Sequence, residues 1–282
     1  MDSCKIQYAS DLHLDETMPF DILLEPVAST LALCGDIGNP FSKIYFNFLK
    51  WCSEHWKTVI LIAGNHEYFS DDSTITMRDI DVKIHEICTK LGIRFLQKGV
   101  FRDDEHKLLI VGCTLWTSPD LRQWDKIADG FIGEIGKRSE YKMVYVKDEY
   151  TNKSRYIHPS DITKINTEHI AFLEKTIKQA RFDNFRVLVL THHMPCKNLI
   201  DSKYRENPLS SCYANNLSYL FKEPIVGWIC GHSHVAGSVR YTTGTLCALN
   251  PRGYKSEANT SGYTRDAVIT IYRENIAVPK RA

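Results

Sequence analysis

Short apolar runs, rich in β-branched residues or leucine, recur along this chain of 282 residues and limit the folds that it can adopt. Nearly continuous apolar character over so few residues is typical of strands covered on both faces, because a strand with one solvated face alternates apolar and polar side chains. We therefore expect sheets that are buried between other layers. The predicted strands are Ile6 to Ala9, Thr30 to Cys34, Thr58 to Ala63, Leu108 to Cys113, Arg186 to Leu190, Ile225 to Cys230, Leu246 to Leu249 and Ala267 to Tyr272.

Helical patterns separate several of these strands. Apolar residues at helical spacing predict helices over 45–56, 77–91 and a segment that follows Ser160. Thr76, three residues ahead of Asp79, is a plausible N-terminal cap for the second helix. Strands that alternate with helices, with more strand-rich sequence late in the chain, indicate an α/β layered fold.

One stretch, residues 118–159, interrupts this pattern. It is rich in Tyr, Lys and Gly and has no long apolar run. We interpret it as an insertion that caps or flanks a site within a single domain of residues 1–282. No repeat or low-complexity tract argues for another organisation.

Composition excludes several other classes of protein. No segment approaches the roughly 18 uncharged apolar residues of a membrane span. The N-terminus does not resemble a secretory signal, so we expect an intracellular protein, cytoplasmic or nuclear. The nine cysteines are scattered, odd in number and form no C-x-x-C pair, which favours reduced, buried thiols. A formal net charge of +1 gives no global attraction to nucleic acid.

Five of the predicted strands end directly in polar residues that can bind metal ions. In layered α/β folds the loops at the carboxyl ends of strands gather at one place, so these five endings can converge. Glycine before three of the polar residues fits such loops, because it permits positive φ and close approach of the backbone. The five segments are Asp11-Leu12-His13, Gly35-Asp36, Gly64-Asn65-His66-Glu67, His192-His193 and Gly231-His232-Ser233-His234.

In their order along residues 11 to 234, these segments resemble the calcineurin-like metallophosphoesterases. The resemblance implies a four-layer α/β/β/α sandwich, in which two packed β-sheets are flanked by helices, and a binuclear metal site. It also implies hydrolysis of phosphodiester or phosphomonoester bonds by a metal-activated hydroxide.

Carried over residue by residue, the resemblance implies two sets of metal ligands that share Asp36. Two cations about 3.5 to 4 Å apart can polarise a phosphoryl oxygen and generate hydroxide near neutral pH. Carboxylate, amide and imidazole donors without thiolate suit Mn, Fe, Zn or Ni, and Mg is a further candidate metal. One metal would take Asp11, His13, Asp36 and His234, and the other would take Asp36, Asn65, His192 and His232.

Other polar residues near these segments have two interpretations each. The resemblance places His66 near the leaving oxygen, to which it would donate. The alternative is that His66 contacts a metal ligand. Nothing in the sequence shows which residue orients His66. Glu67 is either an acceptor for a ligand histidine or a helix-start residue. His193 diverges from its neighbour and is expected to be structural or to face substrate. Arg252 is a solvated turn residue or a phosphate contact.

The substrate is the least constrained part of the prediction. Nucleotides, nucleic acid and lipid-linked diphosphates all remain candidate substrates. The alternative function is a catalytically weak or inactive protein-interaction scaffold of the same fold, and the presence of His66 argues against it. Basic and aromatic residues interleave in the insertion, which suits a nucleotide or single-stranded nucleic acid, while a solvated hairpin is the other interpretation. These residues are Lys137, Arg138, Lys142, Lys147, Lys153 and Arg155 with Tyr141, Tyr145, Tyr150 and Tyr156.

Overall fold

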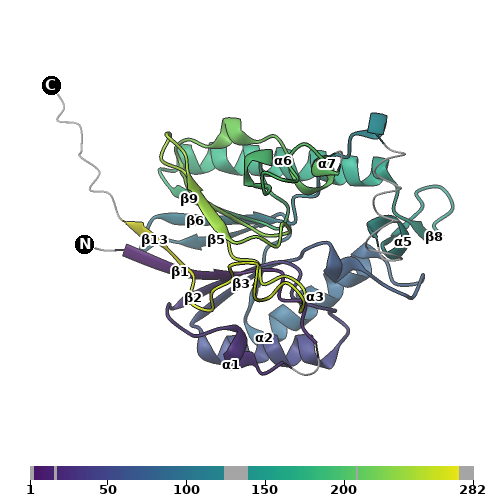
Figure 1. Ribbon diagram of the computed structural model, residues 1–282, viewed down its shortest axis with the longest axis horizontal. Helices are drawn as coiled ribbons and strands as arrows, with labels where there is room; N and C mark the ends of the chain where they lie inside the picture. The colour runs from purple at the N-terminus through teal and green to yellow at the C-terminus, as the bar shows by residue number, and fades with distance from the viewer. Residues whose placement is uncertain (1–2, 16–17, 124–138, 208, 273–282) are drawn as a thin grey trace.

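Two β-sheets lie face to face between helices in the computed structural model, which describes residues 3–15, 18–123, 139–207 and 209–272 (Figure 1). The first sheet has the order β13 (Val268–Tyr272), β1 (Ser3–Ala9), β2 (Thr30–Cys34), β3 (Thr58–Ile62) and β4 (Arg94–Phe95). The second has the order β11 (Gly237–Arg240), β12 (Leu246–Leu249), β10 (Ile225–Cys230), β9 (Arg186–Thr191), β6 (Leu108–Cys113) and β5 (Gly99–Asp103). A separate hairpin pairs β7 (Tyr145–Lys147) with β8 (Ser154–Tyr156).

All eight predicted strands are confirmed, with ends that differ by a few residues. The sequence patterns missed β4, β5 and β11, while the β7–β8 hairpin lies where a hairpin was one of two interpretations of the insertion. All four residues of the edge strand β11 are exposed, and β5 alternates between half-buried and exposed residues. Neither strand therefore has the continuous apolar run by which buried strands are identified.

The three predicted helices are confirmed as α2 (Lys43–His55), α3 (Met77–Leu91) and α6 (Pro159–Phe182). Thr76 and Asp79 form the expected capping box at the start of α3. None of the helices in the described ranges combines the length and the apolar character needed to cross a bilayer. The shorter helices are α1 (Phe20–Leu23), α5 (Glu140–Met143), α7 (Ser210–Tyr213) and the 3-10 turns η1 (His66–Tyr68), η2 (Leu121–Gln123), η3 (Lys197–Leu199) and η4 (Ser218–Leu220).

Three apolar clusters fill the spaces between the layers. Alternate residues of a strand face opposite sides of its sheet. Leu31 and Leu33 of β2 accordingly pack with α2 and α3, while Ala32 and Cys34 pack against the second sheet. On the far side of the second sheet, Val187 of β9 packs with α6. The expected four-layer order, helices, sheet, sheet and helices, is thus confirmed (Figure 1).

Parallel pairing brings the carboxyl ends of neighbouring strands to one edge of each sheet. The strands β1, β2 and β3 are parallel neighbours in the first sheet, and β6, β9 and β10 are parallel neighbours in the second. The loops that follow β1, β2, β3, β9 and β10 carry the five segments singled out in the sequence.

Candidate metal centre

Side chains from the five loops meet in two neighbouring clusters. We call Asp11, His13 and His234 the outer cluster, and Asp36, His192 and His232 the inner cluster; within each, the candidate ligand atoms lie within 4.8 Å of one another. Asp36 connects them, because its Oδ2 atom lies 3.4 Å from Nε2 of His192 and 3.9 Å from Nε2 of His13. This is the position that a bridging carboxylate requires.

The backbone of these loops is held in a conformation that L-residues rarely adopt. Five candidate ligands have positive φ: Asp11 (52°), His13 (42°), Asp36 (54°), His232 (70°) and His234 (51°). Such residues cost free energy and persist only where surrounding structure holds them, and they gather at functional sites. The strain aims these side chains at a common centre.

Glycines before three of the candidate ligands are required by close packing, as the sequence predicts. Gly35 has a φ of 88°, and a Cβ atom there would lie 2.5 Å from Nδ1 of His192. A Cβ atom on Gly231 would lie 2.5 Å from a carboxylate oxygen of Asp11, and one on Gly64 would clash with the carboxylate of Asp36. Any larger residue would displace a candidate ligand.

In the inner cluster, an imidazole nitrogen and an amide oxygen point at each other. His192 donates from Nδ1 to the carbonyl oxygen of Cys34 at 2.9 Å, so Nε2 is the ring atom that can carry either a proton or a metal ion. Asn65 donates from Nδ2 to Oε1 of Glu140 at 2.7 Å, which directs its carbonyl oxygen to the same place. The Nε2 and Oδ1 atoms are 2.9 Å apart. Atoms that face each other in this way need a proton or a metal cation between them, so these residues fit a metal.

The charges in the inner cluster also favour a cation. Burial raises the pKa of Asp36, but the imidazoles of His192 and His66 outweigh it and hold the pKa well below its ordinary value. Burial lowers the pKa of His192, yet the Asp36 carboxylate and its hydrogen bond raise it to about 10. Burial and the neighbouring histidines His193 and His192 lower the pKa of His232 well below its ordinary value. A buried carboxylate therefore draws positive charge into this pocket.

The outer cluster repeats the arrangement with a more exposed set of residues. Nε2 of His13 lies 3.2 Å from Nε2 of His234, which in turn lies 3.3 Å from Oδ1 of Asp11. His234 donates from Nδ1 to Oε2 of Glu257 at 2.7 Å, so its Nε2 is the atom left for a metal. Burial lowers the pKa of His13 to about 4 and so keeps this ring neutral, as a ligand must be.

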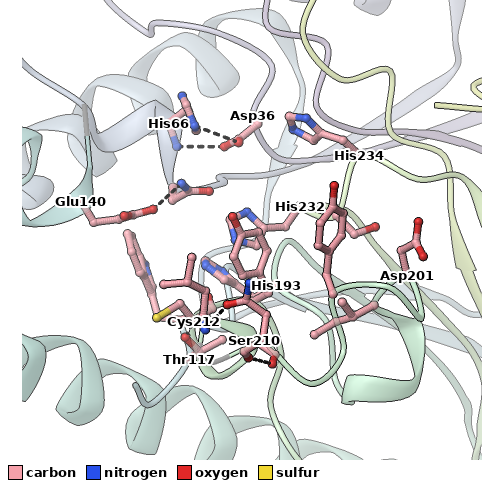
Figure 2. Close-up of a pocket in the computed structure, with 18 of the residues that line it drawn as sticks. Asp36, His66, Thr117, Glu140, His193, Asp201, Ser210, Cys212, His232 and His234 are labelled. Carbon is pink, nitrogen blue, oxygen red and sulfur yellow. Dashed lines mark hydrogen bonds and ion pairs between the residues drawn. The ribbon is translucent and has the colours of Figure 1, made fainter. Parts of the chain in front are cut away.

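The ring of His66 lies at the mouth of the two clusters. Its backbone N–H donates to Oδ1 of Asp36 at 2.9 Å, and its Nε2 atom is 3.9 Å from Oδ2 of the same carboxylate (Figure 2). Nε2 also lies 3.1 Å from the hydroxyl of Tyr254, and the ring packs on Phe69 with centroids 4.4 Å apart. Tyr254 and Phe69 therefore orient His66, which answers the question that the sequence left open.

Three residues with two interpretations now have defined contacts. Glu67 lies in the first turn of η1, as one of its two interpretations expects, and its carboxylate also accepts from the backbone N–H groups of Asp36, Ile37 and Gly64 and so holds two ligand loops together. Arg252 donates to the carbonyl oxygen of Leu12, which supports a structural role in the Asp11 loop.

His193 diverges from its neighbour, as expected. Its ring lies at 89° to that of His192, and its Nδ1 atom is 3.3 Å from the carbonyl oxygen of Thr114. It belongs to neither cluster, although it lines the adjoining cleft.

Sequence reasoning missed three residues of the site, namely Glu140, Glu257 and Tyr254. Glu140 is 75 residues from Asn65, and Glu257 is 23 residues from His234. A single acidic residue at such a distance carries no periodic or motif signal, so only the folded chain identifies these contacts.

A cleft of about 430 Å³ opens beside the inner cluster; we call it the main cleft. Its described lining includes no Lys or Arg, and its non-ligand walls are largely apolar or aromatic. Figure 2 shows His66, Asp36 and His234 on one side of this cleft and His193 and Ser210 on the other. The main residues of these walls are Trp116, Tyr141, Ile162, Ile200, Tyr204, Leu209 and Tyr213.

Some side chains of the hairpin contact one another or α6, whereas Lys147, Lys153 and Tyr150 are exposed. Tyr145 stacks on Tyr156 with ring centroids 4.7 Å apart. Arg155 forms ion pairs with Asp148 and Asp161. Lys137 and Arg138 lie outside the described residues. These contacts and the exposed residues support the interpretation of a solvated hairpin, while Tyr141 reaches the main cleft.

Comparison with known proteins gives a family match and one close fold match. The family model described as calcineurin-like phosphoesterase matches residues 9–236. The uncharacterized protein L509 of Acanthamoeba polyphaga mimivirus is 27% identical over 275 residues, which cover 90% of this chain and 92% of that protein.

Among solved structures, phosphopantetheinyl hydrolase from Mycobacterium tuberculosis is similar with a TM-score of 0.71 and 15% identity, over 99% of this chain and 98% of that chain. A dimetal phosphatase from Danio rerio has a TM-score of 0.49 at 12% identity, over 87% and 86% of the two chains.

Proposed function

Because this chain belongs to the calcineurin-like phosphoesterase family and is a metal-dependent phosphoesterase, we propose that it holds two divalent cations in the outer and inner clusters. Asp11, His13 and His234 would bind one cation, and Asn65, His192 and His232 the other, with Asp36 shared. The observation that carries this proposal is the convergence of Nε2 of His192 on two oxygen atoms, Oδ1 of Asn65 at 2.9 Å and Oδ2 of Asp36 at 3.4 Å.

When bound, the two cations supply Lewis acidity toward the phosphoryl group and a hydroxide nucleophile near neutral pH. The protein holds the ligand atoms in place: Cys34 and Glu257 accept from the Nδ1 atoms of two histidines, and Glu140 accepts from the amide of Asn65. These contacts fix which atom of each ligand faces the metal. The metals themselves, whether Mn, Fe, Zn, Ni or Mg, are not distinguished by this donor set.

We assign His66 as the donor to the leaving oxygen. Its Nε2 atom faces both the Asp36 carboxylate and open space, since the side chain is 27% exposed and lines the main cleft. The hydroxyl of Tyr254 accepts from or donates to this nitrogen at 3.1 Å. A positioned donor of this kind contributes roughly 10²- to 10⁴-fold to a rate.

For the substrate we propose a phosphate ester whose organic part is flat or apolar, with a nucleotide as the first candidate. The support comes from the aromatic wall of the main cleft, where Trp116, Tyr141 and Tyr213 can contact a base or a similar group. The hairpin contacts give no support to binding of a long single strand.

An intracellular location remains a proposal that the thiols support. All nine cysteines are free, and eight of them are buried. Reduced thiols are the normal state in the cytosol and nucleus.

The test is hydrolysis of a panel of phosphate esters by metal-free protein to which Mn, Ni, Zn, Fe or Mg is added back. The panel contains nucleotides, nitrophenyl esters and a phosphopantetheinyl ester, the last because the similar M. tuberculosis enzyme is named for that group. We expect no hydrolysis without metal and recovery with at least one cation at two ions per chain. Equal hydrolysis after proven metal loss would contradict the proposal.

A further inference from the structure

A second hollow adjoins the metal centre. This side groove, of about 630 Å³, includes His13 of the outer cluster in its lining, whereas the main cleft includes Asp36 and His232 of the inner cluster. The two hollows share three lining residues, His66, Phe69 and Tyr254. They therefore meet at the residue proposed to act on the leaving oxygen.

We propose that the substrate is a phosphodiester whose two organic groups occupy these two hollows, one in the main cleft and one in the side groove. This inference rests on the proposed function, because it takes the phosphoryl group to lie at the two clusters. A monoester has one organic group and can fill only one hollow. A diester removes apolar surface from water in both, and each buried aromatic or aliphatic group contributes to binding.

The lining of the side groove defines the second organic group. Its lining combines the apolar side chains of Leu14, Phe41, Ile75 and Met143 with the carboxylates of Asp71 and Asp72. No Lys or Arg is among its described lining residues, although Nζ of Lys83 lies 5.8 Å from the centroid of the Phe41 ring. A further phosphate on this side would meet two carboxylates against this one cation, so an uncharged apolar group fits better than a polynucleotide continuation.

Substitution of Phe41 tests whether an organic group of the substrate occupies the side groove, and it leaves the candidate metal ligands unchanged. Its side chain lines the side groove only, and the residue is 49% exposed. Phe182, at the end of α6, is 86% exposed and lines neither hollow, so it is the matched control.

The experiment compares two probes that have no ester bond to hydrolyse. Phenylphosphonate carries one ring, as a monoester does, and diphenylphosphinate carries two, as a diester does. Calorimetric titration of the metal-loaded protein gives both dissociation constants. We expect Phe41→Ala to raise the ratio of the diphenylphosphinate constant to the phenylphosphonate constant by about 3- to 10-fold. Phe182→Ala should leave this ratio within about twofold of the parent value.

Hydrolysis of bis(nitrophenyl) phosphate and nitrophenyl phosphate gives a second readout, for which Phe41→Ala should lower the diester-to-monoester ratio of kcat/KM by a similar factor. An unchanged ratio in both measurements would overturn the two-hollow inference while leaving metal-dependent hydrolysis in place. Failure of every ester to react with any metal would instead overturn the proposed function. The two failures are therefore distinguishable.

Discussion

The inner and outer clusters use the same ligand types but differ in how fully the protein encloses them. In the inner cluster Asp36 and His192 are buried and only His232 is half-buried, whereas in the outer cluster only Asp11 is buried. In the outer cluster the side chains of His13 and His234 are 12% and 15% exposed. Charges excluded from water interact more strongly, and a fixed ligand loses less freedom on binding. The inner cluster should therefore bind its cation more tightly, while the outer cluster stays open to exchange and to substrate.

The largest effect should come from the residue that the two clusters share. Asp36→Asn removes the bridging charge from both, so we expect kcat/KM to fall by about 10²- to 10³-fold, equivalent to several kcal/mol of lost transition-state stabilisation. Metal content, measured by atomic emission, should fall below two ions per chain. Asp183→Asn, an exposed residue that bonds Gln179, is the control for loss of one carboxylate. Retention of two tightly bound ions in the Asp36 variant would remove the basis for a shared ligand.

Substitution of His66 tests whether this residue is itself a metal ligand, because it lies with His13 and Asp36 in a possible ligand group. If it is a donor to the leaving oxygen, His66→Ala should slow hydrolysis of alkyl esters by about 10²- to 10⁴-fold. Nitrophenyl esters, which leave as stable anions, should lose much less. Metal stoichiometry should stay at two. Equal losses for both ester classes together with a lost ion would make His66 a metal ligand instead.

Glu140 tests the inner cluster through Asn65. Glu140→Ala frees the amide of Asn65 to rotate, and loss of such a supporting contact typically weakens metal affinity by about 10- to 100-fold. Glu140→Gln keeps an oxygen that can accept from the Asn65 amide and should recover most of the affinity. Competition with a chromophoric chelator measures the tighter of the two binding steps. If both variants bind metal like the parent protein, the Glu140 contact does not position Asn65.

Glu257 is the outer counterpart of Glu140, and the smallest effect is expected there. Its side chain is 41% exposed, so water can take over the hydrogen bond from His234 when the carboxylate is removed. Glu257→Ala should weaken the looser binding step by less than about tenfold, the lower end of the range for such contacts. Glu257→Gln should restore it. A larger loss than in Glu140→Ala would reverse the order of enclosure proposed for the two clusters.

The candidate ligands could be predicted from the sequence because all seven come just after one of five strands. A buried strand has a local apolar signature, and the polar residues after it stand out against that background. Gly35, Gly64 and Gly231 added a second local signal, since a side chain at any of them would clash with a ligand. The same locality explains the correct prediction of α3, whose capping pair lies within four residues.

The supporting residues could not be predicted because each depends on one contact between distant segments. Glu140 reaches Asn65 and Tyr254 reaches His66 only after the insertion and the last strands pack around the two sheets. The contacts of Glu67 could not be predicted for the same reason, because its three backbone partners come from two loops. Such contacts leave no periodic pattern in the amino-acid sequence.

The sequence by itself therefore determined the layers, the main strands and helices, and the residue types that end each strand, since burial and loop geometry impose local patterns. Only the tertiary structure decided that His192 and Asn65 face each other, and that the two clusters differ in enclosure. It also placed His66 in the linings of both hollows. These properties depend on distances between segments, which the folded sheets set and which no single segment of sequence contains.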